Sequence, residues 1–157
     1  MKSIEVSYLT IERCGSGLFE TQVINPLIEI AKTDTEISLR LLVVNYFWLL
    51  LHQKSYLKEL RQRLGEAGIR LTLIPFLLPV KFSLKYQWYC RILIYTITLT
   101  LYLIPRGKII HCRGYFATIA ALNSRRFDHV VFDMRSDPVN TPPSTTPGSV
   151  VSLSWLS

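Results

Sequence analysis

The sequence ISLRLLVV, residues 37–44, decides the fold class of this chain. A nearly continuous apolar run of this length is typical of a strand that is buried on both faces of a parallel sheet. Four further β-rich runs, at residues 4–11, 69–75, 108–112 and 129–132, predict a sheet of about five strands.

Helical segments separate the predicted strands, at residues 18–32, 54–67 and 116–123. Pro26 lies inside the first helix and predicts a kink or a late start, because proline lacks the N–H that a helix interior needs. Regular alternation of strand and helix argues for parallel strands joined by right-handed crossovers. The sequence therefore predicts an α/β fold, a Rossmann-like doubly wound parallel sheet with strand order 3-2-1-4-5.

Residues 88–104 (WYCRILIYTITLTLYLI) are the most hydrophobic part of the chain. Their uncharged core is 13 residues long; as a helix it would span roughly 20 Å, less than the ~30 Å hydrocarbon core of a bilayer, so a membrane span is not favoured. The alternating threonines suit a strand, whereas Arg91, Tyr95 and Tyr102 would share one stripe of a helix. As a helix, the segment is either a buried crossover or an interfacial helix whose aromatic residues and basic flanks contact anionic lipid.

The chain has 157 residues, enough for one domain and a tail. We expect residues 1–136 to form the domain and residues 137–157, rich in Pro, Ser and Thr, to be a disordered tail. Three scattered cysteines without a CxxC pair indicate neither a disulfide framework nor a zinc site, and the N-terminus lacks the features of a secretory signal. We therefore expect a cytoplasmic protein without a metal, either soluble or peripheral at the inner face of the plasma membrane.

The net charge of +7 is unevenly distributed. From Lys54 to Lys108 ten basic residues are opposed by two acidic ones, which makes this stretch +8, whereas the rest of the chain has 8 basic and 9 acidic residues and is −1. We expect this region to attract an anionic membrane surface. The stretch lacks a recognisable RNA- or DNA-binding motif, so nucleic acid is not an expected partner.

Ligands of a doubly wound sheet bind at the carboxyl ends of the strands, near the point where the strand order reverses. This rule selects the loops after the first, fourth and fifth strands. The first loop contains Gly15, Ser16 and Gly17, where backbone N–H groups can approach a phosphate at the start of a helix. A dinucleotide fingerprint would need glycine in place of Glu20 and prefers an acidic residue in place of Asn45, so a nicotinamide cofactor is not expected.

The other two loops bring charged side chains to the same edge. His111 and Arg113 end the fourth strand, and a guanidinium in a cleft is a clamp for phosphate or carboxylate. Asp133 and Arg135 end the fifth strand, either as a mutual ion pair or as part of a substrate site. A nucleophilic pair of His111 and Cys112 is not favoured, because adjacent strand residues point to opposite faces.

Three motifs together resemble a known family. GSGLFETQV (residues 15–23), IIHCRGYFA (109–117) and VVFDMR (130–135) are similar to the N-terminal domain of glycosyltransferase family 4. These are retaining enzymes of the GT-B fold, many of which build bacterial polysaccharides. The resemblance covers residues 1 to about 136, and the last two motifs are more specific than the first. It implies an N-terminal GT-B half that binds a lipid-linked or polysaccharide acceptor, with a nucleotide sugar as co-substrate and no cofactor.

The resemblance also implies roles for the loop residues. Gly15, Ser16 and Gly17 would approach the phosphates and sugar of the donor across the cleft. His111 and Arg113 would lie near the transferred sugar as catalytic residues, although many relatives carry their catalytic histidine at the position of Arg113. The motif with Asp133 and Arg135 would line the cleft.

Relatives continue after the last motif into a second Rossmann-like domain, which supplies a Glu-rich motif and basic residues for the nucleotide diphosphate. The residues that follow the motif here are too few and too rich in Pro, Ser and Thr for such a domain. We therefore expect this chain to be truncated before its donor-binding half and to transfer sugar weakly or not at all by itself. The alternative is a non-catalytic binding or interaction module at the membrane surface.

Overall fold

A computed structural model describes residues 4–34, 36–77 and 86–133. The predicted tail, residues 137–157, and Arg135 lie outside the described residues. The strands are β1 (Ile4–Thr10), β2 (Ile37–Tyr46), β3 (Arg70–Phe76), β4 (Gly107–Arg113) and β5 (Phe127–Asp133). The helices are α1 (Gly17–Phe19), the π-helix η1 (Glu20–Ile24), α2 (Asn25–Thr33), α3 (Phe47–His52), α4 (Lys54–Glu66), α5 (Tyr86–Leu103) and α6 (Tyr115–Ser124).

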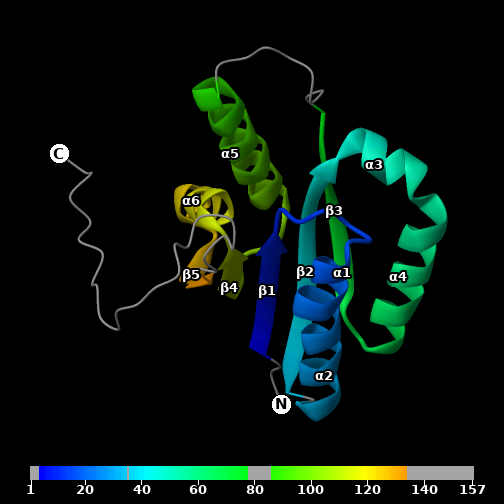
Figure 1. The fold of residues 1–157 in the computed structure, drawn as a ribbon. Coiled ribbons are helices and arrows are strands. Elements are labelled where there is room, and N and C mark those ends of the chain that lie inside the picture. The colour runs from blue at the N-terminus through cyan, green and yellow to red at the C-terminus, as the bar shows by residue number, and fades with distance from the viewer. Residues whose placement is uncertain (1–3, 35, 78–85, 134–157) are drawn as a thin grey trace, which may run out of the picture.

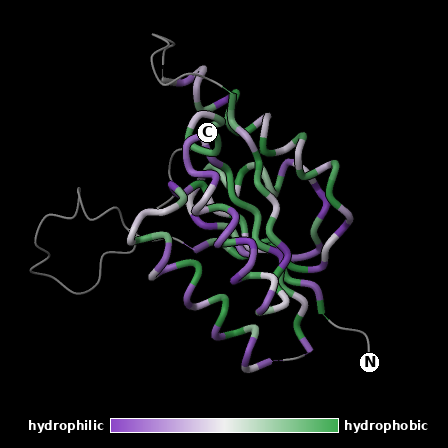
Figure 2. Tube along the Cα trace, turned by 90° about the vertical axis from the view of Figure 1, so that its right-hand side faces the viewer, coloured by the Kyte–Doolittle hydropathy of each residue, from purple (hydrophilic) through white to green (hydrophobic). Residues whose placement is uncertain are grey.

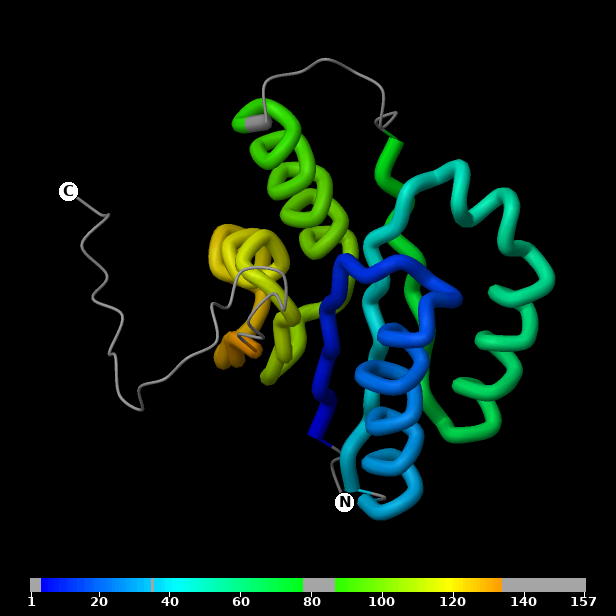
Figure 3. Tube along the Cα trace, viewed as in Figure 1, coloured from blue at the N-terminus to red at the C-terminus, as the bar shows by residue number. Residues whose placement is uncertain are grey.

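The five strands form one parallel sheet in the order β3-β2-β1-β4-β5 (Figure 1). Val6 of β1 pairs with Leu39 of β2 on one side and with Ile109 of β4 on the other. The chain builds outward from β1 to β3 and then returns through α5 to begin β4, a path that Figure 3 traces. The strand order therefore reverses between β1 and β4, and the predicted Rossmann-like doubly wound fold and strand order are confirmed.

The apolar run in β2 is buried on both faces, as predicted. Leu41 and Val43 belong to one hydrophobic core, whereas Leu42 and Val44 belong to the core on the other side of the sheet. All four side chains are almost completely inaccessible to solvent. Because residues of a strand alternate between its two faces, this single run supplies both cores.

The first core lies between the sheet and a layer formed by α1, η1, α2 and α4. α4 contributes Leu57, Leu60 and Leu64, the three leucines that the helical spacing predicted to point inward. The helix ends at Glu66, and Gly68 adopts a left-handed backbone conformation with φ of 74°. Glycine reaches this conformation without steric penalty, which explains its place after the helix.

Pro26 delays the start of α2, as expected. The chain first makes the short helix α1 and the π-helix η1, and α2 begins at Asn25 with Pro26 in its first turn. Proline is tolerated there because the first N–H groups of a helix have no intrahelical acceptor.

The second core lies under α5 and α6 on the opposite face of the sheet. Leu93, Ile97 and Leu101 of α5 point into this core. The hydroxyls of Thr96 and Thr100 donate to the carbonyls four residues earlier, at 2.9 and 2.8 Å, so the threonine alternation is accommodated in a helix and the strand alternative for residues 88–104 is wrong. Among the described residues, no helix has both the length and the hydrophobicity needed to cross a membrane.

The outer side of α5 is also apolar. Packing against the sheet therefore explains the hydrophobic residues on only one side of this helix. Tyr95, Leu99 and Leu103 are all well exposed. The helix has a single charged residue, Arg91, whose guanidinium lies over the ring of Trp88 at 5.7 Å from its centroid. In Figure 2 the helices alternate between hydrophilic and hydrophobic residues along their length.

The basic stretch between Lys54 and Lys108 does not form one surface. Lys58 and Arg61 are exposed on α4, which packs on the first core, whereas Arg91 is exposed on α5, which packs on the second. Figure 1 shows these two helices on opposite sides of the sheet. An anionic surface that contacts one of the two basic groups would therefore face away from the other.

Candidate functional site

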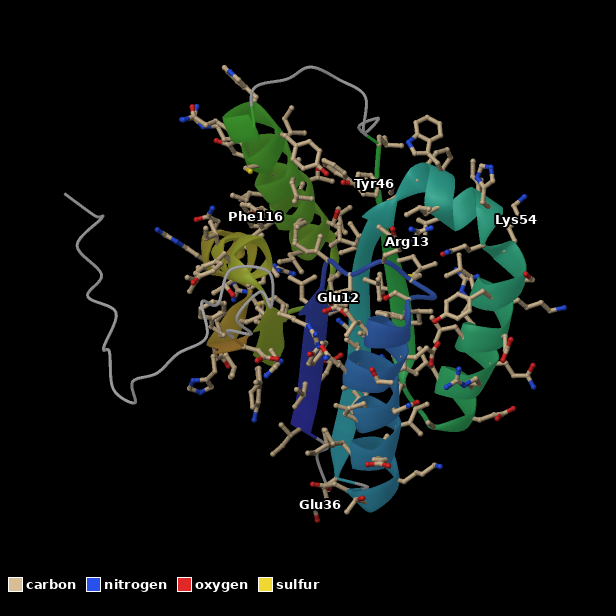
Figure 4. The ribbon with its side chains drawn as sticks, viewed as in Figure 1. Glu12, Arg13, Glu36, Tyr46, Lys54 and Phe116 are labelled. Carbon is tan, nitrogen blue, oxygen red and sulfur yellow. The ribbon has the colours of Figure 1, made fainter. Side chains whose placement is uncertain are left out.

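The carboxyl edge of the sheet carries the residues that the sequence singled out. Figure 4 shows Glu12, Arg13 and Tyr46 near the ends of β1 and β2, whereas Glu36 lies at the opposite end of the sheet. Because all strands are parallel, the loop after β1 and the ends of β4 and β5 lie along this one edge. The edge is therefore the candidate functional site.

The glycine loop after β1 rests against the start of α4 and the residue before it. Gly15 has φ of 76°, and a Cβ at this position would lie 3.5 Å from Nε2 of Gln53. Ser16 is the N-cap of α1, where its hydroxyl accepts the N–H of Phe19 at 3.1 Å. A Cβ at Gly17 would meet nothing within 4 Å, so Gly17 is the part of the loop with open space around it.

Glu20 fastens the segment after the glycine loop to α4. Its carboxylate accepts hydrogen bonds from the hydroxyl of Tyr56 and from both terminal nitrogens of Arg63, the latter at 3.2 Å. Burial and the hydrogen bond to Glu20 raise the pKa of Tyr56, so its hydroxyl keeps the proton that it donates. The residue that replaces the third glycine of a dinucleotide fingerprint thus has a packing role in this fold.

Arg113 joins the end of β4 to the end of β1. Its mostly buried side chain forms an ion pair with Glu12 and donates to the side-chain oxygen of Gln22. It also donates to the backbone carbonyl of Gln22 at 3.3 Å. That carbonyl lies four residues before Pro26, which has no N–H to give it. The guanidinium predicted as a phosphate clamp is therefore engaged by protein oxygens.

His111 stacks on Tyr8 of β1, with ring centroids 4.8 Å apart and an interplanar angle of 17°. Tyr8 packs against the first core, whereas Cys112 is buried in the second. His111 and Cys112 therefore point to opposite faces of the sheet, as strand geometry predicts. Burial raises the pKa of the Cys112 thiol to about 12, so it is not a thiolate at neutral pH.

Asp133 ends β5 and pairs in register with Arg113 of β4. Its backbone carbonyl accepts the N–H of Gly114 at 3.4 Å, which brings the ends of the two strands together. The predicted partner of Asp133, Arg135, lies outside the described residues, and their ion pair stays a prediction. Within residues 4–34, 36–77 and 86–133, no group of three or more His, Cys, Asp or Glu side chains could hold a metal ion.

A cavity of about 390 Å³ opens at the carboxyl ends of β1, β2 and β3, on the side of β1 away from β4 and β5. Of the three predicted loops only the first reaches it, through Arg13. The expectation that ligands bind where the strand order reverses pointed instead to the ends of β1 and β4. The available signal was the run Tyr46-Phe47-Trp48, because three consecutive aromatic residues at the end of a buried strand are candidates for a pocket wall.

The cavity wall is mainly aromatic and aliphatic. Tyr46 from the end of β2 and Tyr89 from α5 share a hydrogen bond between their hydroxyls. Phe76 from β3 packs edge-on against Tyr89, with centroids 5.4 Å apart. The lining residues are Ile11, Arg13, Val44, Asn45, Tyr46, Trp48, Leu49, Phe76, Tyr89 and Leu93.

These features define the class of the chain, an α/β protein with a five-stranded parallel sheet of the Rossmann-like, doubly wound type. No family model, curated protein or solved structure matches it. The fold class is thus supported by the structure, and any particular activity has to be argued from the residues at the carboxyl edge.

Proposed function

We propose that the domain is the acceptor-side part of a nucleotide-sugar-dependent retaining glycosyltransferase for polysaccharide or glycolipid synthesis. The observation that carries this proposal is the meeting of three motifs at one sheet edge: the glycine loop after β1, residues 111–113 of β4 and Asp133 of β5. Their sequences are the ones that resemble glycosyltransferase family 4. Transfer would require a donor-binding domain on the other side of the edge.

In this proposal the open glycine loop approaches the negative charge that develops on the donor's diphosphate. The backbone N–H groups of Gly17 and Leu18 would supply hydrogen-bond donors that need no reorganisation during the reaction, since that of Phe19 is bonded to Ser16. His111 is the proposed catalytic residue beside the transferred sugar. Arg113 reaches the sugar or phosphate only if it exchanges Glu12 for the ligand, so its ion pair sets the electrostatics of the edge.

The test is to supply a donor-binding domain. The chain is mixed with the donor-binding domain of a family 4 enzyme, and the release of nucleoside diphosphate is measured for a panel of nucleotide sugars. The proposal expects release above the sum of the two separate domains, and a loss of about 10²-fold or more in His111→Ala. No release with any donor, from a mixture in which both domains are folded, would contradict the glycosyltransferase proposal.

Gly17→Ala tests, in the same assay, whether the glycine loop contributes to transfer. Its methyl group enters space that is open in the fold, so the variant should fold normally but obstruct a phosphate that approaches the loop. The matched control is Gly65→Ala, which also enters open space but lies on α4. Equal activity of the two variants would remove the glycine loop from the proposed site.

A second candidate function is a non-catalytic binding module at an anionic membrane surface. Two observations favour it: Arg113 is engaged by Glu12 and Gln22, and the outer side of α5 is apolar. No acidic residue occurs between Glu66 and Asp128, so the whole of α5 and α6 lacks negative charge. Apolar and aromatic side chains with nearby cations are what binding to anionic lipid headgroups requires.

Flotation with lipid vesicles tests this candidate. The wild-type chain should float with phosphatidylcholine vesicles that contain phosphatidylglycerol and should dissociate as salt is raised, because the cations contribute through screened attraction. Arg91→Glu should abolish flotation, whereas Lys58→Glu on α4 should leave it nearly unchanged. Binding that ignores anionic lipid and salt, or an equal loss in both variants, would exclude α5 as the contact surface.

A further inference from the structure

The aromatic cavity at the ends of β1, β2 and β3 is assigned no role by the proposed function. It is separate from the motifs of β4 and β5, and its volume of about 390 Å³ lies in the lower part of the ~300–1,000 Å³ range of small-molecule sites. A binding role for this cavity goes beyond sugar transfer and does not depend on it.

The walls of the cavity are fixed by contacts between three elements. Tyr46, Phe76 and Tyr89 come from β2, β3 and α5, and their rings contact one another with centroid distances of 5.9 Å (Tyr46–Phe76) and 5.4 Å (Phe76–Tyr89). The two tyrosine hydroxyls are hydrogen-bonded to each other. Their polar ends are therefore satisfied within the wall, and the surface that faces the cavity is largely the apolar part of the rings.

Asn45 lines the cavity, but its amide is directed elsewhere. It is only 4% exposed, and its Oδ1 accepts the N–H of Tyr46 at 2.9 Å. Its Nδ2 faces the buried thiol of Cys14, which belongs to the first core, whereas the neighbouring Val44 belongs to the second. Recognition of charge in the cavity therefore depends on Arg13.

Arg13 adds a positive charge to the same lining. Its side chain is exposed and forms no ion pair with the described residues, and no acidic side chain lines the cavity. A cationic ligand would therefore lack a counter-charge there. A sugar would find few hydrogen-bond partners, because most of the lining is hydrocarbon.

We infer that this cavity binds a small aromatic anion, with an apolar ring between Tyr46, Phe76 and Tyr89 and a phosphate or carboxylate at Arg13. The ring is recognised by stacking and edge contacts with the wall, and the anion by the guanidinium. The charged group remains near the exposed guanidinium, so its desolvation is partial.

The probe is 2-naphthyl phosphate, which has both features, and the readout is the fluorescence of Trp48 in the lining. Titration should change the emission of the wild-type chain and of Trp88→Phe, and should change much less the emission of Trp48→Phe, which lacks the tryptophan of the lining. Inorganic phosphate alone should have no effect. No saturable change with naphthyl phosphate in the wild-type chain would overturn the inference.

Two variants separate the anionic end from the apolar end. Arg13→Gln should weaken binding of naphthyl phosphate about tenfold and leave binding of neutral 2-naphthol unchanged, because one charge-assisted contact is removed. The matched control is Arg106→Gln, an exposed arginine outside the cavity lining, which should bind as the wild type does. Equal affinity of the wild-type chain for naphthol and naphthyl phosphate would overturn the anion assignment.

Leu93→Trp tests the apolar end, since a larger side chain at this lining position fills the cavity. It should abolish binding of both probes, and circular dichroism establishes that the variant is folded; if it is not, Val44→Ile is the milder replacement. A nucleoside monophosphate is the final comparison, because it joins phosphate to a polar ring. If it bound more tightly than naphthyl phosphate, the apolar ring would be the wrong ligand class. Binding that survives in the filled, folded variant but is lost in Leu99→Glu would place the probe on α5 instead.

Discussion

The two helical layers of this sheet differ in what they present to solvent. The layer of α2 and α4 buries its leucines and covers them with charged side chains, and Glu20 of η1 links that segment to α4 through Tyr56 and Arg63. The layer of α5 and α6 buries a similar set of apolar residues but leaves others exposed, among them Leu99 and Tyr102. Both layers bury the apolar side chains of the sheet. Only the layer of α2 and α4 has the charged outer surface that is usual for solvent-exposed protein.

This difference distinguishes the apolar residues that folding requires from those that folding does not require. A crossover helix needs one apolar side, and the leucines of α4 show that three inward residues on a polar helix suffice. The additional hydrophobic residues of α5 face outward, where they contribute little to the core. Exposed apolar surfaces are often contact sites for lipid or protein, and the proposed membrane contact of α5 rests on this one.

The largest expected effect comes from the two cores themselves. Ile97 in α5 and Leu60 in α4 are both fully buried, and replacing either with alanine should lower the free energy of unfolding by about 3 kcal/mol. Denaturant unfolding of the two variants measures this directly. If Ile97→Ala lost less than about 1 kcal/mol, α5 would not be packed as α4 is, and the comparison would fail.

The next effect concerns close packing beneath α6. A Cβ at Gly107 would lie 2.9 Å from Cε1 of Phe127, so Gly107→Ala should cost about 2 kcal/mol of stability. In the other layer Gly65→Ala meets no neighbour and should add up to about 1 kcal/mol, because alanine restricts the unfolded chain and favours the helix. Thermal or denaturant melts of both variants should therefore shift in opposite directions.

The third prediction uses the buried thiol in the second core. An unfolded chain ionises Cys112 near its ordinary pKa of 9.0, whereas the folded chain holds the proton up to about pH 12. The unfolded state loses its proton first, so this group makes the free energy of unfolding fall between these values by up to about 1.4 kcal/mol per pH unit. Cys112→Ala should show a shallower decline over the same range, and identical slopes would contradict the burial of this thiol.

The smallest expected effect on stability is at the outer surface of α5. Leu99→Gln should change the free energy of unfolding by less than about 0.5 kcal/mol, because Leu99 is exposed. The same change should reduce vesicle flotation and raise solubility. A loss of stability as large as that of Ile97→Ala would mean that this side of α5 is buried.

The sequence was sufficient for the fold because the relevant signals are local. The run at residues 37–44 predicted β2, and the spacing of Leu57, Leu60 and Leu64 predicted the inward side of α4. The placement of α4 and α5, which carry different parts of the basic stretch, on opposite faces also follows from strand order 3-2-1-4-5, since helices before and after the reversal lie on opposite sides. That consequence was missed by counting charges along the chain.

The site was harder to predict because its decisive contacts join distant residues. Nothing near Arg113 in the sequence indicates that Glu12 and Gln22 bind its guanidinium. The contact of Tyr46 with Tyr89 depends equally on where α5 crosses the sheet. The glycine loop could be placed from its local pattern, whereas the engagement of the arginine and the aromatic cavity required the three-dimensional arrangement.

The central position of β1 has a consequence for the order in which the chain folds. β1, β2 and β3 are contiguous along the sequence and can pair as soon as they have emerged from the ribosome. The other side of β1 must wait for β4, because Val6 pairs with Ile109 near the far end of the described chain. Closing so long a loop is slow, and an unpaired strand edge is prone to aggregation in the interval. During synthesis, the first strand to be made thus waits longest for its second partner.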